Sequence, residues 1–283
     1  MMRGGAAGMQ DGGMAKAGFF NAVTSQAALI CLALLMLAGC AATPPATKPG
    51  PAPNPPAPLP WTAAIGSLTE PGTSHICTAS LIRPDLILTA AHCLYPPNRT
   101  LAPDQLVFRP NAGRAPVFDA LPVRAVQMLG GQVHEGHIDA LDVPVDWAFL
   151  RIARAPGELH PLPIEALSPG QVTQRLAAGD QFYSAGFGGG DKTMLRQHDG
   201  CDPVEPRALG LDLPGGITVT TCIIRPGDSG GPMVLLDAAG KPHLFAVISS
   251  LAQRRGGLAP IGLGVSAGAF AHQLDRFLLS SAD

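Results

Sequence analysis

After Trp61, glycines and prolines divide the chain into short apolar runs. Of all the features of the sequence, this one restricts the possible folds most. The sequence holds 34 glycines and 29 prolines, two residue types that interrupt helices and strands and favour turns. The runs at 86–91, 123–129, 147–152 and 181–187 are apolar or alternating. Such runs between turns predict an all-β domain of short strands.

The first 39 residues have a different character. Residues 27–39 form an apolar stretch of 13 residues, which is too short for an ordinary membrane span and suits the core of a signal peptide. We therefore predict a signal peptide over 1–39, with Met14 as an alternative start. The stretch ends in Leu37-Ala-Gly-Cys40, which resembles the lipobox of bacterial lipoproteins and implies that Cys40 is lipidated. The alternative is an ordinary secretory signal followed by an incidental cysteine.

Residues 40–60 are expected to form a tether between a lipidated Cys40 and the folded domain at 61–283. Nine of the 20 residues from Ala41 to Pro60 are proline, so this segment favours an extended coil of roughly 60 Å. Ala41 and Ala42 stand where an Asp often marks inner-membrane retention. The expected location is the outer membrane, facing the periplasm or the cell surface, with a soluble secreted protein as the alternative.

The stretch RPGDSGGP, residues 225–232, surrounds Ser229 with small residues. Glycine allows positive φ and close approach of the backbone, as needed where peptide N–H groups converge on one point. If Ser229 is a nucleophile, the N–H groups of Gly227 and Ser229 are candidates for stabilising a developing oxyanion. The alternative is a glycine-rich turn between strands. A serine hydroxyl also needs a base and a group that orients the base.

His92 is the candidate base, and we expect it to be exposed at the end of the apolar run 86–91. Cys93 follows it, and Cys77 precedes it in another β-like run. A disulfide between the two would fix the loop that carries His92. In the chain-entropy model, such a bond stabilises the fold by on the order of 3 kcal/mol for a loop of about 15 residues.

Asp146 is the preferred candidate for the orienting carboxylate. It stands at the entrance of the apolar run DWAFLRI, so its side chain can be buried against an imidazole. Asp139 and Asp142 lie close by in a more polar loop and remain chemically possible.

The stretches TAAHC, DWAFL and GDSGGP occur in the order His, Asp, Ser, and together they resemble the chymotrypsin/trypsin-like serine peptidase family, in its secreted bacterial branch. This order distinguishes the family from other enzymes with the same triad. The resemblance implies two packed six-stranded antiparallel β-barrels, a C-terminal helix near 270–278 and an active site between the barrels. It also implies that His92 is the base, Asp146 orients it and Ser229 forms an acyl-enzyme.

The family pattern assigns further residues. It pairs Cys77 with Cys93, which leaves Cys201 and Cys222 as the expected second disulfide in an exported protein. Ser249 matches a serine that hydrogen-bonds the catalytic Asp. The four cysteines contain no C-x-x-C pair, and 134–137 is not H-E-x-x-H, so we expect no metal and no other cofactor.

The specificity pocket is expected to include Ile223, Ser249, Leu251 and Gly264. Trypsin-like members have an Asp where this chain has Ile223, so we expect cleavage after apolar or small residues rather than after Lys or Arg. Leu251 replaces a glycine that is common in the pocket wall, which would make the pocket shallow.

The family's zymogens are cleaved before Ile-Val-Gly-Gly, and the new amine pairs with the Asp that precedes the nucleophile, here Asp228. This chain offers only Ala64-Ile-Gly-Ser67. We therefore predict that no such cleavage is needed and that Asp228 has another partner.

The formal net charge of −2 and the short pair Arg254-Arg255 give no sign of nucleic-acid binding. We expect a monomeric serine endopeptidase that acts on proteins or peptides. A catalytically silent binding or adhesion module and an esterase on the same fold are the alternatives.

Overall fold

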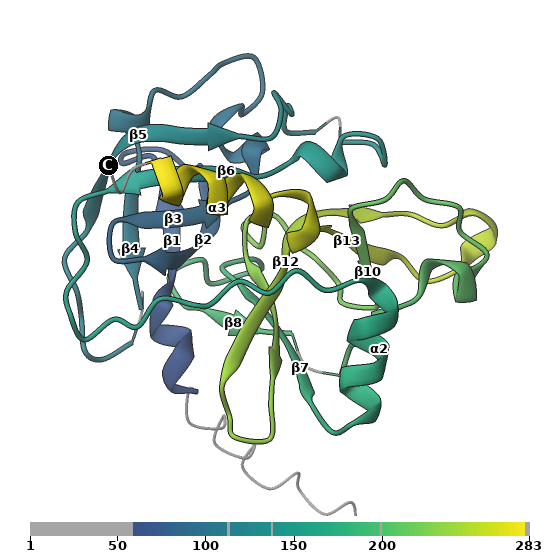
Figure 1. The fold of residues 1–283 in the computed structure, drawn as a ribbon. Helices are drawn as coiled ribbons and strands as arrows, with labels where there is room; N and C mark the ends of the chain where they lie inside the picture. The colour runs from purple at the N-terminus through teal and green to yellow at the C-terminus, as the bar shows by residue number, and fades with distance from the viewer. Residues whose placement is uncertain (1–58, 112–113, 137, 199, 281–283) are drawn as a thin grey trace, which may run out of the picture. The chain divides into compact units, whose positions relative to one another are not determined.

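The apolar runs form strands of two antiparallel sheets in the computed structural model (Figure 1). The structure describes residues 59–111, 114–136, 138–198 and 200–280, all within the compact unit Ala57–Asp283. The signal peptide, Cys40 and nearly all of the tether lie outside these residues. Among the helices that are described, none combines the length and the apolar character needed to cross a membrane.

The first sheet closes into a six-stranded barrel in the order β1-β2-β3-β6-β5-β4. Its strands are β1 (Ile65–Thr69), β2 (Ile76–Arg83), β3 (Leu86–Thr89), β4 (Val107–Pro110), β5 (Leu121–Leu129) and β6 (Ala148–Ile152). Every residue of β3 is buried, as its continuous apolar sequence predicts. Phe108 of β4 and Phe149 of β6 are fully buried.

The second sheet has seven strands in the order β8-β7-β11-β12-β13-β10-β9. They are β7 (Gln181–Gly186), β8 (Arg196–Gln197), β9 (Pro203–Val204), β10 (Ile217–Thr220), β11 (Pro232–Leu236), β12 (Pro242–Ala252) and β13 (Ile261–Ser266). This sheet is a curled half-barrel of seven strands rather than six, and with the first barrel it agrees with the expected fold of two packed β-barrels. Both edge strands have only two residues, and Pro203 has no N–H for a closing ladder.

In the described ranges, two α-helices accompany the sheets. The expected C-terminal helix is present as α3 (Ala271–Ser280). The sequence reading did not anticipate α2 (Pro169–Ala177), although Ser168 and Gln171 form a capping box and Pro169 occupies the first turn. Val172 of α2 packs in the apolar cluster of the second sheet.

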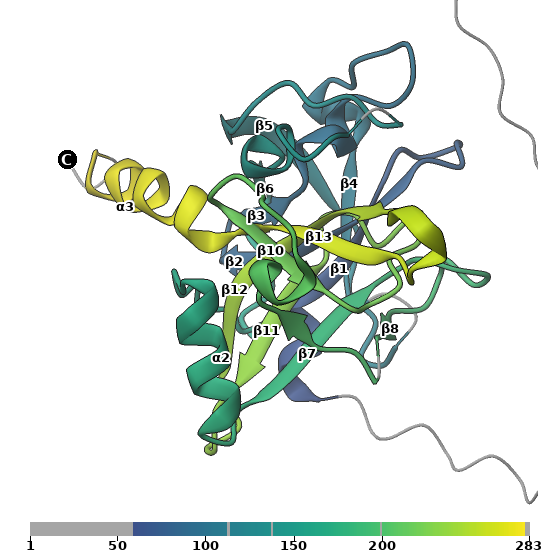
Figure 2. The same ribbon diagram turned by 90° about the vertical axis from the view of Figure 1, so that its right-hand side faces the viewer.

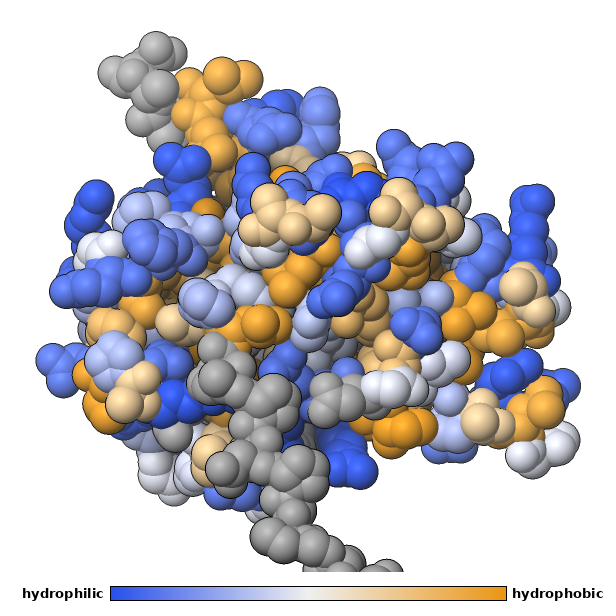
Figure 3. Space-filling model, turned by 90° about the horizontal axis from the view of Figure 1, so that it is seen from below, coloured by the Kyte–Doolittle hydropathy of each residue, from blue (hydrophilic) through white to orange (hydrophobic). Residues whose placement is uncertain are grey.

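Aromatic packing joins the first barrel to the C-terminal segment. Phe270, just before α3, lies with its ring centroid 5.8 Å from those of both Trp147 and Phe149. Figures 1 and 2 show the first barrel, from purple to teal, on one side and the green-to-yellow second sheet on the other. On the face in Figure 3, apolar side chains form small separate patches between polar ones. One hydrophobic cluster contains buried residues of both sheets, so the two sheets share a core.

Candidate active site

His92 and Asp146 meet because their strands are paired. β3 and β6 are antiparallel, and Thr89 at the end of β3 lies opposite Ala148 at the start of β6. His92 follows β3 in a 3-10 turn, η3 (Ala91–Leu94), and Asp146 immediately precedes Trp147 at the entrance to β6. The two side chains therefore leave the same end of one strand pair.

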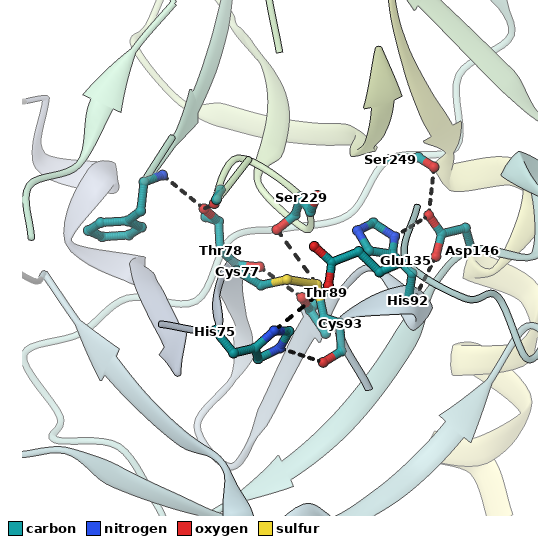
Figure 4. The surroundings of a disulfide bond; sticks show 12 residues. His75, Cys77, Thr78, Thr89, His92, Cys93, Glu135, Asp146, Ser229 and Ser249 are labelled. Atoms are coloured by element: carbon teal, nitrogen blue, oxygen red, sulfur yellow. Dashed lines mark hydrogen bonds and ion pairs between the residues drawn. A yellow bond between two sulfur atoms is a disulfide. The ribbon is translucent and has the colours of Figure 1, made fainter. Parts of the chain in front are cut away.

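The Asp146 carboxylate holds the His92 ring in one orientation (Figure 4). Its Oδ1 accepts the backbone N–H of His92 at 2.8 Å, and its Oδ2 lies 2.8 Å from Nδ1 of the ring. A carboxylate only accepts, so Nδ1 carries the hydrogen and Nε2 keeps a free lone pair. His92 is only 3% exposed, which corrects the expectation of an exposed histidine: the loop around it is covered by both sheets.

Ser249 completes the surroundings of Asp146. Its hydroxyl donates to Oδ2 of Asp146 at 2.6 Å, as expected from the resemblance. The register of β12 against β13 shifts between Ile248 and Ser250, so Ser249 is the extra residue of a β-bulge. A bulge re-aims a side chain, which is how a strand residue reaches a carboxylate from the other sheet.

The two other candidate acids have local roles. Asp139 Oδ1 accepts the N–H of Leu141, and Asp142 Oδ2 accepts the N–H of Asp139. Both carboxylates therefore stabilise the loop before β6, whereas Asp146 is the acid that contacts His92.

The loop of Ser229 is fastened to β2 by Thr78. The N–H of Thr78 donates to the Ser229 carbonyl at 2.7 Å, and its hydroxyl donates to the Gly227 carbonyl at 2.7 Å. The same hydroxyl accepts the N–H of Phe187 at 3.0 Å. A single threonine of the first barrel thus fixes the backbone on both sides of Asp228.

Two glycines are required in this loop. Gly227 has φ +105°, in the region that side chains disfavour. Gly230 has φ +82°, and a Cβ there would lie 2.1 Å from the carbonyl oxygen of Thr78. Glycine therefore lets the serine loop lie directly against β2.

The donors around Ser229 are uncommitted. Within the described part of the chain, no hydrogen bond uses the N–H of Gly227 or of Ser229, and none links the Ser229 hydroxyl to His92. Two free peptide donors beside a serine are what an oxyanion site requires. Hydrogen bonds of catalytic groups are often long in structures without substrate and tighten when it binds.

Asp228 has a partner other than a chain terminus. This carboxylate is 1% exposed and accepts three hydrogen bonds: one from Gly188 N–H at 2.8 Å, one from Arg225 N–H at 2.8 Å and one from His198 Nε2 at 3.1 Å. Nδ1 of His198 lies 3.0 Å from the hydroxyl of Ser184. The buried carboxylate is thus satisfied by the hairpin that β7 and β8 form.

Ile65 does not contact Asp228 as the amine of a cleaved chain would. It lies in β1, opposite Ser80 of β2, and its carbonyl accepts the N–H of Asn111. Residues 64–67 therefore enter the first strand of the barrel, and the contacts of Asp228 do not involve an amine at Ile65.

Both expected disulfides are present. Cys77–Cys93 joins β2 to η3, and Cys201–Cys222 joins the two segments that follow β8 and β10. Cys77, His92 and Cys93 also lie close enough together to resemble a metal site. The two sulfurs are bonded to each other and the ring faces Asp146, so no thiolate ligand is left there.

The structure does not gather the four residues of the expected specificity pocket. Ile223 is 46% exposed and lines a cavity of about 320 Å³ with His198 and Asp228, without Ser249 or Leu251. Leu251 packs against the cluster that contains Cys222 and Ile224.

Gly264 of β13 lies opposite Ile248 of β12. It faces inward, and a Cβ on it would lie 2.9 Å from Met233 Cε. The glycine opposite Leu251 is Gly262, where a Cβ would lie 2.8 Å from Ile224. The bulge at Ser249 offsets the pairing of β12 with β13 by one residue.

Two residues that organise the site were missed, Thr78 and His198. Thr78 follows Cys77 directly, and its position next to this cysteine is the feature of the sequence that could have pointed to it. His198 lies in a segment without a recognisable pattern, and only the fold brings it to Asp228.

Comparison with known proteins gives one result. The family model described as a trypsin-like peptidase domain matches residues 77–242, a range that contains His92, Asp146 and Ser229. No curated protein matches the chain.

Proposed function

Because the chain belongs to the trypsin-like peptidase family, we propose that it is a serine endopeptidase whose nucleophile is Ser229. His92 Nε2 takes the Ser229 proton as the hydroxyl attacks the carbonyl carbon of a peptide bond. Asp146 holds the ring and stabilises the imidazolium, and the N–H groups of Gly227 and Ser229 bind the oxyanion. His92 then protonates the leaving amine, and water releases the acyl group by the same route.

One observation carries this proposal: a fully buried Asp146 receives both the backbone N–H and the ring of His92 and, in addition, the hydroxyl of Ser249. Such a set of contacts orients an imidazole, whereas a binding module has no need of it. The partnership of Asp228 with His198 further supports an oxyanion loop that is set without cleavage of the chain.

A peptide library tests the proposal. The purified full chain is incubated with unmodified peptides, and the products are identified by mass spectrometry, with Ser229→Ala as control. We expect cleavage at internal bonds that is absent from the variant. Hydrolysis of small esters without any peptide cleavage would identify an esterase, and a folded protein without either activity would be a silent binding module.

The same library tests the shallow pocket. We expect small or short apolar residues before the cleaved bond, because Leu251 occupies the space beside Ile224. Leu251→Gly should raise kcat/KM for Leu or Phe relative to Ala at this position by about tenfold. Leu258→Gly, which changes an exposed leucine, is the matched control. An unchanged preference in Leu251→Gly would show that this side chain does not limit the pocket.

We also propose that Cys40 is lipidated and holds the domain at 61–283 on the outer membrane through the proline-rich segment. The support is the sequence around Leu37-Ala-Gly-Cys40 alone. Metabolic labelling with a fatty-acid analogue and fractionation of the two membranes test it. Cys40→Ser should abolish both label and membrane attachment, and attachment that survives in this variant would refute the anchor.

A further inference from the structure

A groove leads away from the oxyanion loop along the edge of the first barrel. Its near part, a cavity of about 340 Å³, begins at Pro226 and Gly227. Its far part, a cavity of about 530 Å³, lies over Ser67 of β1 and Arg109 of β4. Both parts are lined by residues 73–76 and by Lys192, so they form one continuous path, which we call the β1 groove.

The β1 groove lies on the leaving-group side of the site. The expected specificity pocket, which would take the acyl part of a substrate, includes Ser249 and Leu251 of β12 on the other side. Figure 4 shows His75 and Ser249 on opposite sides of Ser229 and His92, and His75 Nε2 bonds the Cys93 carbonyl at 2.9 Å. A peptide that passes over Ser229 with its acyl part toward β12 therefore enters the groove with its leaving part.

Apart from Lys192, which both parts share, the charged groups of the near part are paired or close to an opposite charge. Arg99 binds Glu70 through both guanidinium ends, at 2.7 and 2.6 Å, and this contact lowers the pKa of the Glu70 carboxyl. His75 lies 3.9 Å from Glu135. The near part thus gives little preference for substrate charge.

The far part is different, because its lining includes Arg109, Arg114 and Lys192 and no Asp or Glu. Arg109 and Lys192 are exposed and have no ion pair with any residue in the described ranges. Arg114 donates only to neutral oxygens, those of Thr62 Oγ1 at 3.0 Å and the Leu195 carbonyl at 3.1 Å. Burial without a carboxylate lowers the pKa of this arginine.

The walls of the far part strengthen its attraction for an anion. Ile76, Val117 and Phe118 line it together with the three cations. Apolar walls reduce the screening of charge by water, so a carboxylate that enters gains more from a guanidinium than it would on an open surface.

We infer that the far part of the β1 groove binds acidic side chains on the leaving-group side of the substrate, beyond the first residue after the cleaved bond. This inference rests on the proposed peptidase function and adds a substrate class to it: proteins with an Asp- or Glu-rich segment after the cleavage point.

The test uses quenched fluorescent peptides of one sequence with Glu, Ala or Lys at the second to fourth residues after the cleaved bond. With the full chain at low salt, we expect kcat/KM for the Glu peptide to exceed that for the Lys peptide by roughly 100-fold and that for the Ala peptide by roughly tenfold. Higher salt should narrow these ratios.

Variants connect the preference to the groove. Arg109→Gln/Lys192→Gln removes two exposed cations and should reduce the ratio of Glu to Lys peptide by about tenfold or more. Arg83→Gln/Lys241→Gln removes the same two charges elsewhere on the surface and should leave it unchanged. A small acyl ester without a leaving peptide should be hydrolysed equally by all three proteins.

The possible results distinguish the proposed peptidase function from the inferred preference for acidic side chains. Failure to hydrolyse any peptide would refute the proposed function. Hydrolysis at equal rates for Glu, Ala and Lys peptides, or an acidic preference that both double variants retain, would overturn the inference while the peptidase function stands.

Discussion

Two histidine–aspartate pairs with buried carboxylates belong to this site, and they differ in what the second ring nitrogen of each histidine contacts. Asp146 and Asp228 each accept three hydrogen bonds, one at Oδ1 and two at Oδ2. The first pair leaves Nε2 of His92 without a partner among the described residues. In the second pair, both ring nitrogens of His198 are occupied, one by Asp228 and one by Ser184.

This difference indicates that His92 can act as a proton acceptor, whereas His198 can only hold other groups in place. A ring with one free nitrogen can take up and release a proton, as a general base must. A ring held at both nitrogens fixes what it touches, and His198 touches the carboxylate between the two candidate oxyanion donors. The proposed function thus gives the same pair of residue types two roles, which differ in what the second ring nitrogen contacts.

The largest effect is expected from Asp146→Asn. The amide cannot hold His92 in the tautomer that leaves Nε2 free, and loss of this carboxylate costs a serine peptidase about 10⁴ in kcat. The measurement is kcat on a cleavable peptide, with thermal melting to establish the fold. A loss of less than tenfold in a folded variant would mean that Asp146 does not orient the base.

Asp228→Asn should come next, with a loss of about 10²–10³ in kcat, the size of losing one oxyanion donor. The NH2 group of the amide must face the N–H of either Gly188 or Arg225, two donors then oppose each other, and the loop shifts. Breaking a buried pair also destabilises a fold by about 3–5 kcal/mol. Activity and the free energy of unfolding are measured together. If kcat stays normal, the loop does not depend on this carboxylate.

Variants of His198 test whether this residue only positions the Asp228 carboxylate or must also take up a proton. His198→Ala leaves Asp228 without one donor and should lower kcat by about 10- to 100-fold, the range for a hydrogen bond to a charged group. His198→Gln keeps an N–H donor and should recover most of this loss. If Gln were as damaging as Ala, the imidazole itself would be needed, and the contrast with His92 would fail.

The smallest effects should come from the two serines that support the pairs. Ser249→Ala removes a donor from Asp146 and should lower kcat by about tenfold. Ser184→Ala acts on His198, one step farther from the loop, and should change kcat by about twofold or less. Equal losses in kcat would show that the two pairs contribute alike to the reaction.

Local motifs made part of this site predictable from sequence. TAAHC, DWAFL and GDSGGP each place one reactive side chain beside its own strand or turn, so His92, Asp146 and Ser229 could be assigned without a fold. The barrel strands followed from continuous apolar runs, and α3 from helical spacing near Phe270.

The remaining features depend on contacts that no short motif encodes. His198 meets Asp228 only because the β7–β8 hairpin folds against the serine loop, and Thr78 acts through backbone register. The bulge at Ser249 places Gly262, and not Gly264, opposite Leu251. The open second sheet results from its two-residue edge strands, whose pairing is too short to be predicted. By contrast, the capping box at Ser168 and Gln171 was a readable signal for α2.

Covalent labelling of the folded full chain by a fluorophosphonate probe tests the central claim most directly, because this reagent reacts with an activated serine. The account predicts rapid labelling of the wild type, none in Ser229→Ala or His92→Ala, and slower but definite labelling in His198→Ala. A folded wild-type protein that stays unlabelled, or labelling that persists in His92→Ala, would contradict the assignment of Ser229 as a nucleophile activated by the first pair.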